Sequence, residues 1–153
     1  MNGLILKVYF FLATTCPISQ QYTAYINQFT QAAKAKGIKT LLVFPTGKTN
    51  INKEIYTFRQ KYSIIAPVKM DRQYKLTKQL NASVTPEVFV LNDKNEILYH
   101  GAIDNWYYAL GQNRINVTAH YLDDAIHKLM QSMPVQMPFV KPVGCFIETG
   151  KSL

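Results

Sequence analysis

Apolar residues in the first part of the chain form continuous runs separated by a helix-like pattern. Ile5–Leu12 and Ile38–Phe44 are rich in β-branched, aromatic and aliphatic residues, which is typical of buried strands. Between the two runs, one face of a helix is formed by apolar residues at i, i+4, i+7 and i+11: Tyr22, Ile26, Phe29 and Ala33. Gly37 suits the end of that helix. The pattern predicts a β-α-β unit with two parallel strands.

Further elements follow along the chain. Strands are predicted at Pro67–Met70, Glu87–Leu91 and Glu96–His100, with a polar turn and antiparallel pairing between the last two. A helix is predicted from a cap at Asp71 to about Leu80. Two more helices are indicated by apolar faces, the second of them capped by Thr118: Ile51, Ile55, Phe58 and Tyr62, and then Leu122, Ile126, Leu129 and Met133.

The C-terminal region has a different pattern. Pro134, Pro138 and Pro142 recur at every fourth position, so residues 133–143 are expected to be extended rather than helical. We therefore expect one domain over residues 1–133 and an extended tail over residues 134–153, which either packs on the domain or leads out of it. The tail carries Gly144-Cys145-Phe146.

Composition narrows the function classes. The chain has 153 residues, 48% of them hydrophobic, which suits one domain with a real core. The net charge is +8, but Lys and Arg are scattered without a run of four, which argues against nucleic-acid binding and favours a basic surface that attracts acidic partner proteins. The longest apolar stretch, Val8–Ala13, is too short for membrane insertion. We interpret it as part of a strand and not as a signal peptide.

The cysteine and histidine content also argues against a disulfide-rich fold and against common metal sites. The two cysteines are too few for a disulfide-rich scaffold or a four-cysteine zinc site. The three histidines are scattered, and none of them forms a metal-binding pair with a cysteine or an acid at a useful spacing.

Cys16 occupies a chemically special position. It lies where the first predicted strand meets the first predicted helix, and backbone N–H groups at a helix N-terminus stabilise a thiolate, the reactive form of cysteine. Pro17 suits the first helical position. The alternative is that Cys16 is a small buried apolar residue without reactivity.

Pro86 marks a second candidate element, directly before the strand Glu87–Leu91. An X-Pro bond can be cis, and a cis-proline commonly exposes the preceding backbone for pairing with an extended partner. The alternative is that this proline simply begins a strand.

These elements together resemble the thioredoxin superfamily, and most closely the thioredoxin-like redoxins that are similar to peroxiredoxins. The resemblance is carried by Leu6–Pro17, by the β-α-β unit, and by three later segments: Val84–Leu91, Tyr99–Asn105 and Gly144–Ile147. It implies an α/β fold with a central mixed β-sheet flanked by helices. It also implies that Cys16 is the nucleophile and that Pro86 is a cis-proline facing it.

The chain departs from its relatives at informative positions. Thioredoxins have a second cysteine three residues after the first, where this chain has Ser19. Peroxiredoxins have threonine three residues before the reactive cysteine, and proline four residues before that, where this chain has Ala13 and Tyr9. Cys145 has three interpretations: a resolving thiol for Cys16, one half of a permanent disulfide, or a residue that is simply buried or leads to a neighbouring domain.

The resulting hypothesis is a bacterial thiol–disulfide oxidoreductase that needs no metal or organic cofactor. Cys16 would attack a disulfide of a partner protein, with Ser19 donating a hydrogen bond to its sulfur. Cys145 or an external thiol would resolve the mixed disulfide. Pro17, Thr85, Pro86 and Trp106 are the candidate substrate-binding residues. The resemblance suggests the periplasm or another extracytoplasmic location, with the cytoplasm as the alternative. The other functions considered are a thiol peroxidase and a non-catalytic protein-binding module.

Overall fold

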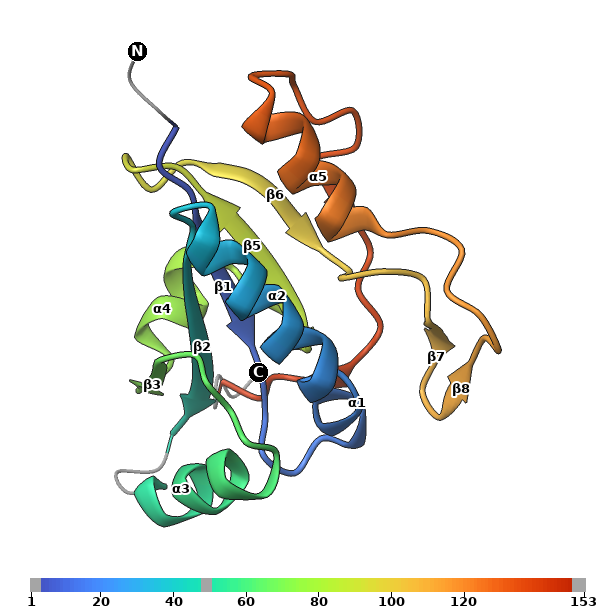
Figure 1. Ribbon diagram of the computed structural model, residues 1–153. Coiled ribbons are helices and arrows are strands. Elements are labelled where there is room, and N and C mark those ends of the chain that lie inside the picture. Colours follow the sequence, from blue (N-terminus) through green and yellow to red (C-terminus); the bar gives the residue numbers. More distant parts are fainter. Residues whose placement is uncertain (1–3, 48–50, 150–153) are drawn as a thin grey trace.

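The computed structural model describes residues 4–47 and 51–149, and its centre is a six-stranded mixed β-sheet (Figure 1). Strand β1 (Lys7–Phe11) pairs in parallel with β2 (Lys39–Thr46) and antiparallel with β5 (Glu87–Leu91). Beyond β2 lies β3 (Val68–Arg72), and beyond β5 lie β6 (Ile97–Gly101) and then β9 (Phe139–Val140). The order β3-β2-β1-β5-β6-β9 confirms the predicted mixed sheet and its parallel β-α-β unit.

Helices cover both faces of the sheet, because the residues of its strands alternate between two apolar clusters. Helices α2 (Thr23–Ala35), α3 (Asn52–Lys61) and α5 (Tyr121–Met130) pack on the face of β1 that carries Val8 and Phe10. The opposite face carries Phe11 and is covered by α4 (Lys75–Leu80). The two layers of helices and the sheet between them can be followed in Figure 1.

Helix ends differ in part from the sequence expectation. The first predicted helix is divided at Tyr22 into α1 (Pro17–Gln21) and α2. Asp71 lies in β3, and the N-cap residue of α4 is Tyr74. The Asp71 carboxylate still binds the start of the helix, because it accepts the backbone N–H groups of Leu76 at 2.8 Å and Thr77 at 2.7 Å.

The cap predicted for the last helix is wrong. α5 begins at Tyr121, and the side chain of Thr118 accepts a hydrogen bond from the Asn105 amide at 2.7 Å instead of capping the helix. The helix ends at Met130 rather than Met133. The Asn105 side chain binds both the hydroxyl and the backbone N–H of Thr118. This contact with a residue distant in the sequence takes the place of the helix cap that was expected at Thr118.

The C-terminal tail returns to the domain at two places. β9 extends the main sheet next to β6, and β10 (Cys145–Phe146) pairs antiparallel with β4 (Val84–Thr85). The loop between β6 and α5 contains the small hairpin of β7 (Tyr107–Ala109) and β8 (Gln112–Asn113). Among the described residues, no helix is long and apolar enough to cross a bilayer.

Candidate functional site

Cys16 lies where the sheet passes into its first helix. It is the N-cap residue of α1, Pro17 is the first residue of that helix, and Cys16 is only 2% exposed. A turn brings its backbone N–H to the carbonyl of Ala13 at 3.2 Å. The β1–α1 connection therefore presents the sulfur at the end of the sheet, as expected from the position of Cys16 in the sequence.

Ser19 shapes this connection. Its side chain is fully buried, and its Oγ accepts a hydrogen bond from the Ala13 N–H at 3.3 Å. The expected partner of Ser19 was the sulfur of Cys16. The structure gives Ser19 a backbone partner instead, which makes it a residue that holds the loop in front of the cysteine.

Cys145 is bonded to Cys16. The two residues are 129 positions apart in the sequence, their Cα atoms are 6.2 Å apart, and the described part of the chain has no free cysteine. Cys145 is partly exposed, unlike Cys16. The disulfide rules out the interpretation of Cys145 as a free buried residue.

Thr85 and Pro86 lie against the disulfide. The Cys16 sulfur is 3.3 Å from the carbonyl oxygen of Thr85, and the peptide bond between Thr85 and Pro86 is cis. Cys145 is the register partner of Thr85 in the β4–β10 pair, and the Ile147 N–H donates to the Ser83 carbonyl at 3.0 Å. The tail thus lies along β4 as an added strand that brings its own cysteine to Cys16.

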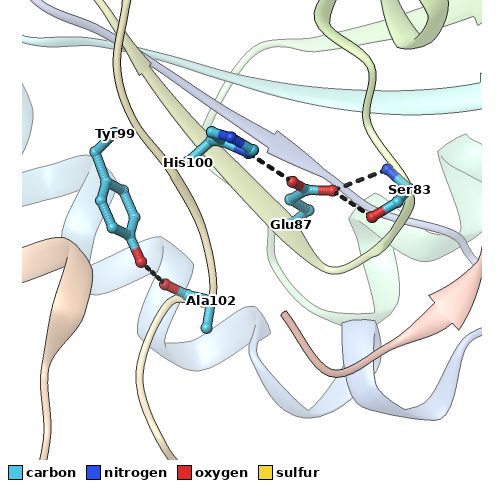
Figure 2. A network of polar contacts seen from close by, with 5 residues as sticks. All are labelled: Ser83, Glu87, Tyr99, His100 and Ala102. Atoms are coloured by element: carbon cyan, nitrogen blue, oxygen red, sulfur yellow. Dashed lines mark hydrogen bonds and ion pairs between the residues drawn. The ribbon is translucent and has the colours of Figure 1, made fainter. Parts of the chain in front are cut away.

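Glu87 supports the segment next to the disulfide from inside the protein (Figure 2). It directly follows Pro86, is 1% exposed, and accepts hydrogen bonds from the backbone N–H of Ser83 at 2.9 Å and its hydroxyl at 3.1 Å. The other carboxylate oxygen lies 3.0 Å from Nδ1 of His100. Glu87 therefore holds Ser83, whose carbonyl binds the tail. The sequence signal for this role is an acid at the start of an otherwise apolar strand.

The His100 ring is itself fixed by aromatic contacts. It stacks on Phe89 with ring centroids 5.1 Å apart, and its centroid is 4.6 Å from that of Phe139 in the tail. In the same strand, the Tyr99 hydroxyl donates to the Ala102 carbonyl at 2.6 Å (Figure 2). These contacts link β5 and β6 to β9 in the tail.

A cleft of about 520 Å³ opens beside the disulfide. Cys16, Thr85 and Cys145 contribute to its wall, together with Thr14 and Thr15. Among the described residues that line it, the charged ones are Glu54 and Glu148. The described lining of the cleft is therefore acidic, in contrast to the net charge of the chain.

Trp106 does not belong to the described lining of this cleft. Its ring packs edge-on against Tyr22 with centroids 5.3 Å apart, and its backbone N–H donates to Asp104 at 2.9 Å. In this position the Trp106 ring packs on the domain through Tyr22.

The described residues hold no group of three or more histidine, cysteine or acidic side chains suited to a metal ion. The group at the site with chemistry of its own is the Cys16–Cys145 disulfide, which can exchange with a thiolate.

Solved structures share this fold. An uncharacterized conserved protein from Geobacillus kaustophilus superposes with a TM-score of 0.82 at 18% identity, over 99% of this chain and 81% of that one. StoA from Bacillus subtilis gives a TM-score of 0.55 at 21% identity, over 65% of this chain and 74% of that one. A secreted Mycobacterium tuberculosis disulfide oxidoreductase gives 0.54 at 12% identity, over 84% and 82%.

Comparison with curated protein sequences gives no match. The family model described as Redoxin matches residues 6–105, which include β1, Cys16, the β-α-β unit and the Thr85–Pro86 segment. This match covers most of the chain, and it agrees with the thioredoxin-like arrangement of the sheet. The chain therefore belongs to the Redoxin family.

Proposed function

We propose that the protein is a thiol–disulfide oxidoreductase that uses Cys16 as its nucleophile. The observation that carries this proposal is the Cys16–Cys145 disulfide, placed at the N-cap of α1 and against the Thr85 carbonyl. Backbone N–H groups at the start of a helix favour the thiolate that thiol–disulfide exchange requires. The Redoxin match supports the same class of reaction.

The reaction takes two exchange steps. In the reduced protein, the Cys16 thiolate attacks one sulfur of a partner's disulfide, forms a mixed disulfide, and releases the partner's second cysteine as a thiolate. A second thiolate, from Cys145 or from an external thiol, then attacks the Cys16 sulfur and expels the partner's remaining cysteine. When Cys145 performs this step, the partner leaves reduced and the protein keeps the disulfide that the structure contains.

The tail takes part in this cycle as a movable segment. We assign residues 1–133 to the domain and residues 134–153 to the tail, because the tail contacts the domain through β9 and β10, which are strands of two residues each. Thr85 and Pro86 form the edge that binds the partner's extended chain, and Pro17 lies exposed beside the reactive cysteine. The contribution of Trp106 to partner binding is indirect, because its ring packs against Tyr22 and not beside the disulfide.

Partners and location follow from the chemistry. The partners are proteins with thiols or disulfides, and the net charge of +8 favours acidic ones through the surface outside the cleft. An extracytoplasmic location suits a protein disulfide, and one structural neighbour is described as secreted.

The two cysteines provide matched variants for a test. The reduced protein is mixed with insulin, and disulfide cleavage and covalent adducts are followed by mass spectrometry. We expect Cys16→Ser to form no adduct, and Cys145→Ser to accumulate an adduct at Cys16 because the second step has lost its thiol. Cleavage of insulin by Cys16→Ser at the rate of the unchanged protein would contradict the proposal. So would a folded protein whose disulfide resists millimolar dithiothreitol, since that behaviour belongs to a permanent structural disulfide.

A further inference from the structure

Gly144, directly before Cys145, lies on the backbone of β4. A Cβ atom at this position would be 2.2 Å from the carbonyl oxygen of Thr85 and 2.7 Å from its carbonyl carbon. Both atoms belong to the main chain, so no side-chain rotation can relieve the contact. Glycine is the residue that fits here without displacing either β4 or the tail.

The residues after Cys145 differ sharply in their contacts. Phe146 is 80% exposed, so its side chain adds little to the docking of the tail. Ile147 packs against the smaller apolar cluster, which contains Leu80 and Phe89, and its N–H donates to Ser83. Docking therefore depends on glycine before the cysteine and on an aliphatic residue two positions after it.

We propose that the edge formed by Ser83, Thr85 and Pro86 selects partner segments in which glycine precedes the reactive cysteine and an aliphatic residue follows two positions later. This inference rests on the proposed function, because it treats the tail as a partner segment that is carried by the protein itself. It adds to that function the class of sequence that the site accepts.

The geometry leaves a partner little choice of path. Its cysteine has to bond to the Cys16 sulfur, which lies 3.3 Å from the Thr85 carbonyl, while its backbone pairs with β4 as the tail does. These two constraints place the residue before that cysteine on the Thr85 carbonyl, where Gly144 lies in the structure. The tail and a partner therefore compete for this edge and bind it alternately.

Activated peptides test the selection directly. The full chain carrying Cys145→Ser is reduced and mixed with a pentapeptide that copies residues 143–147, with its cysteine linked to 5-thio-2-nitrobenzoate. The Cys16 thiolate bonds to the peptide sulfur, and the coloured thionitrobenzoate that leaves is measured. Each rate is divided by the rate of the same peptide with glutathione, and mass spectrometry identifies the adduct.

Three altered peptides give the expected pattern. Alanine in place of the glycine slows the reaction about tenfold, because the added methyl group meets the Thr85 backbone. Serine in place of the isoleucine slows it about fivefold, through lost apolar burial. Serine in place of the phenylalanine changes it by less than about twofold, because that side chain is exposed.

The same rule is tested within the chain. In the otherwise unchanged protein, Gly144→Ala should lower the equilibrium constant for the Cys16–Cys145 disulfide against glutathione about tenfold. Lys141→Ala, in the exposed part of the tail, is the matched control and should leave it unchanged. Equal rates for all four peptides, with the adduct on Cys16, would overturn the selection rule and leave the proposed function intact. Absence of an adduct with every peptide would contradict both.

Discussion

Tyr22, at the break between α1 and α2, forms a buried polar pair with the loop that carries Trp106. It is 4% exposed, and its hydroxyl donates to Asp104 at 2.5 Å. Asp104 also accepts the backbone N–H of Trp106. Burial, followed by the hydrogen bond to Asp104, raises the pKa of Tyr22 far above its ordinary value of 10.0.

This pair predicts how stability depends on pH at the alkaline end. Above pH 10.0 the unfolded chain loses the Tyr22 proton while the folded protein keeps it, so folding stability is full below that pH and falls above it. Above pH 10.0, one such tyrosine lowers the free energy of unfolding by about 1.4 kcal/mol for each pH unit. Tyr22→Phe should be less stable than the unchanged protein by about 1–2 kcal/mol at pH 8, through the lost hydrogen bond.

Urea unfolding at pH 8 and pH 11 checks this prediction. The difference in the free energy of unfolding between the unchanged protein and Tyr22→Phe should be smaller by about 1 kcal/mol at the higher pH. Tyr108→Phe is the control, because Tyr108 is 54% exposed. A difference of constant size would show that the proton on Tyr22 is not linked to folding.

At the level of secondary structure elements, β9 joins the sheet through a backbone contact that requires glycine. Gly101, at the end of β6, has a φ of +130°, and a Cβ atom there would be 1.8 Å from the Val140 carbonyl oxygen. Gly101 is the register partner of Val140, so a side chain at this position would push β9 off the sheet edge. β9 begins the path that brings Cys145 to Cys16.

Gly101→Ala should therefore destabilise the protein and loosen the tail. Gly37→Ala is a matched control, because Gly37 also has a positive φ, of +75°, but has free space around its Cβ position. We expect a loss of about 1 kcal/mol for Gly37→Ala, from backbone conformation alone. Gly101→Ala should lose about 2–3 kcal/mol more, because the methyl group meets β9.

Urea unfolding gives both values, and hydrogen exchange of the Ala102 N–H, which donates to Val140 at 2.9 Å, reports on β9 itself. Faster exchange in Gly101→Ala alone would support the contact with β9. Equal losses of stability in the two variants would contradict it.

At the level of the whole molecule, the disulfide closes a loop of 129 positions that includes every strand of the main sheet except β1. Such a link restricts the unfolded chain and stabilises the folded one by up to about 5 kcal/mol in the chain-entropy model. Dithiothreitol should lower the free energy of unfolding by a large part of this value. The double variant Cys16→Ser with Cys145→Ser should not respond to the reductant. A reduced protein as stable as the oxidised one would contradict this prediction, because the link would then add nothing through the unfolded chain.

The candidate site was only partly predictable. Cys16 and Pro86 could be identified because local sequence creates their positions, at a strand–helix junction and before a buried strand. Ser19 was identified with a different hydrogen-bond partner, and Glu87 was missed. Both side chains bind backbone groups whose positions depend on how separate segments pack, so composition and spacing could not supply their partners.

The sequence by itself determined those strands and helices whose type follows from the spacing of their apolar residues. Continuous apolar runs produced β1, β2 and β5, and the spacing of Ile26 and Phe29 produced the buried face of α2, because side-chain burial follows the period of the backbone. The tertiary structure alone decided where the tail goes. β4, β9 and β10 are two residues long and carry no periodicity. They form because Gly101 and Gly144 let backbones meet across the fold, and that meeting joins Cys145 to Cys16.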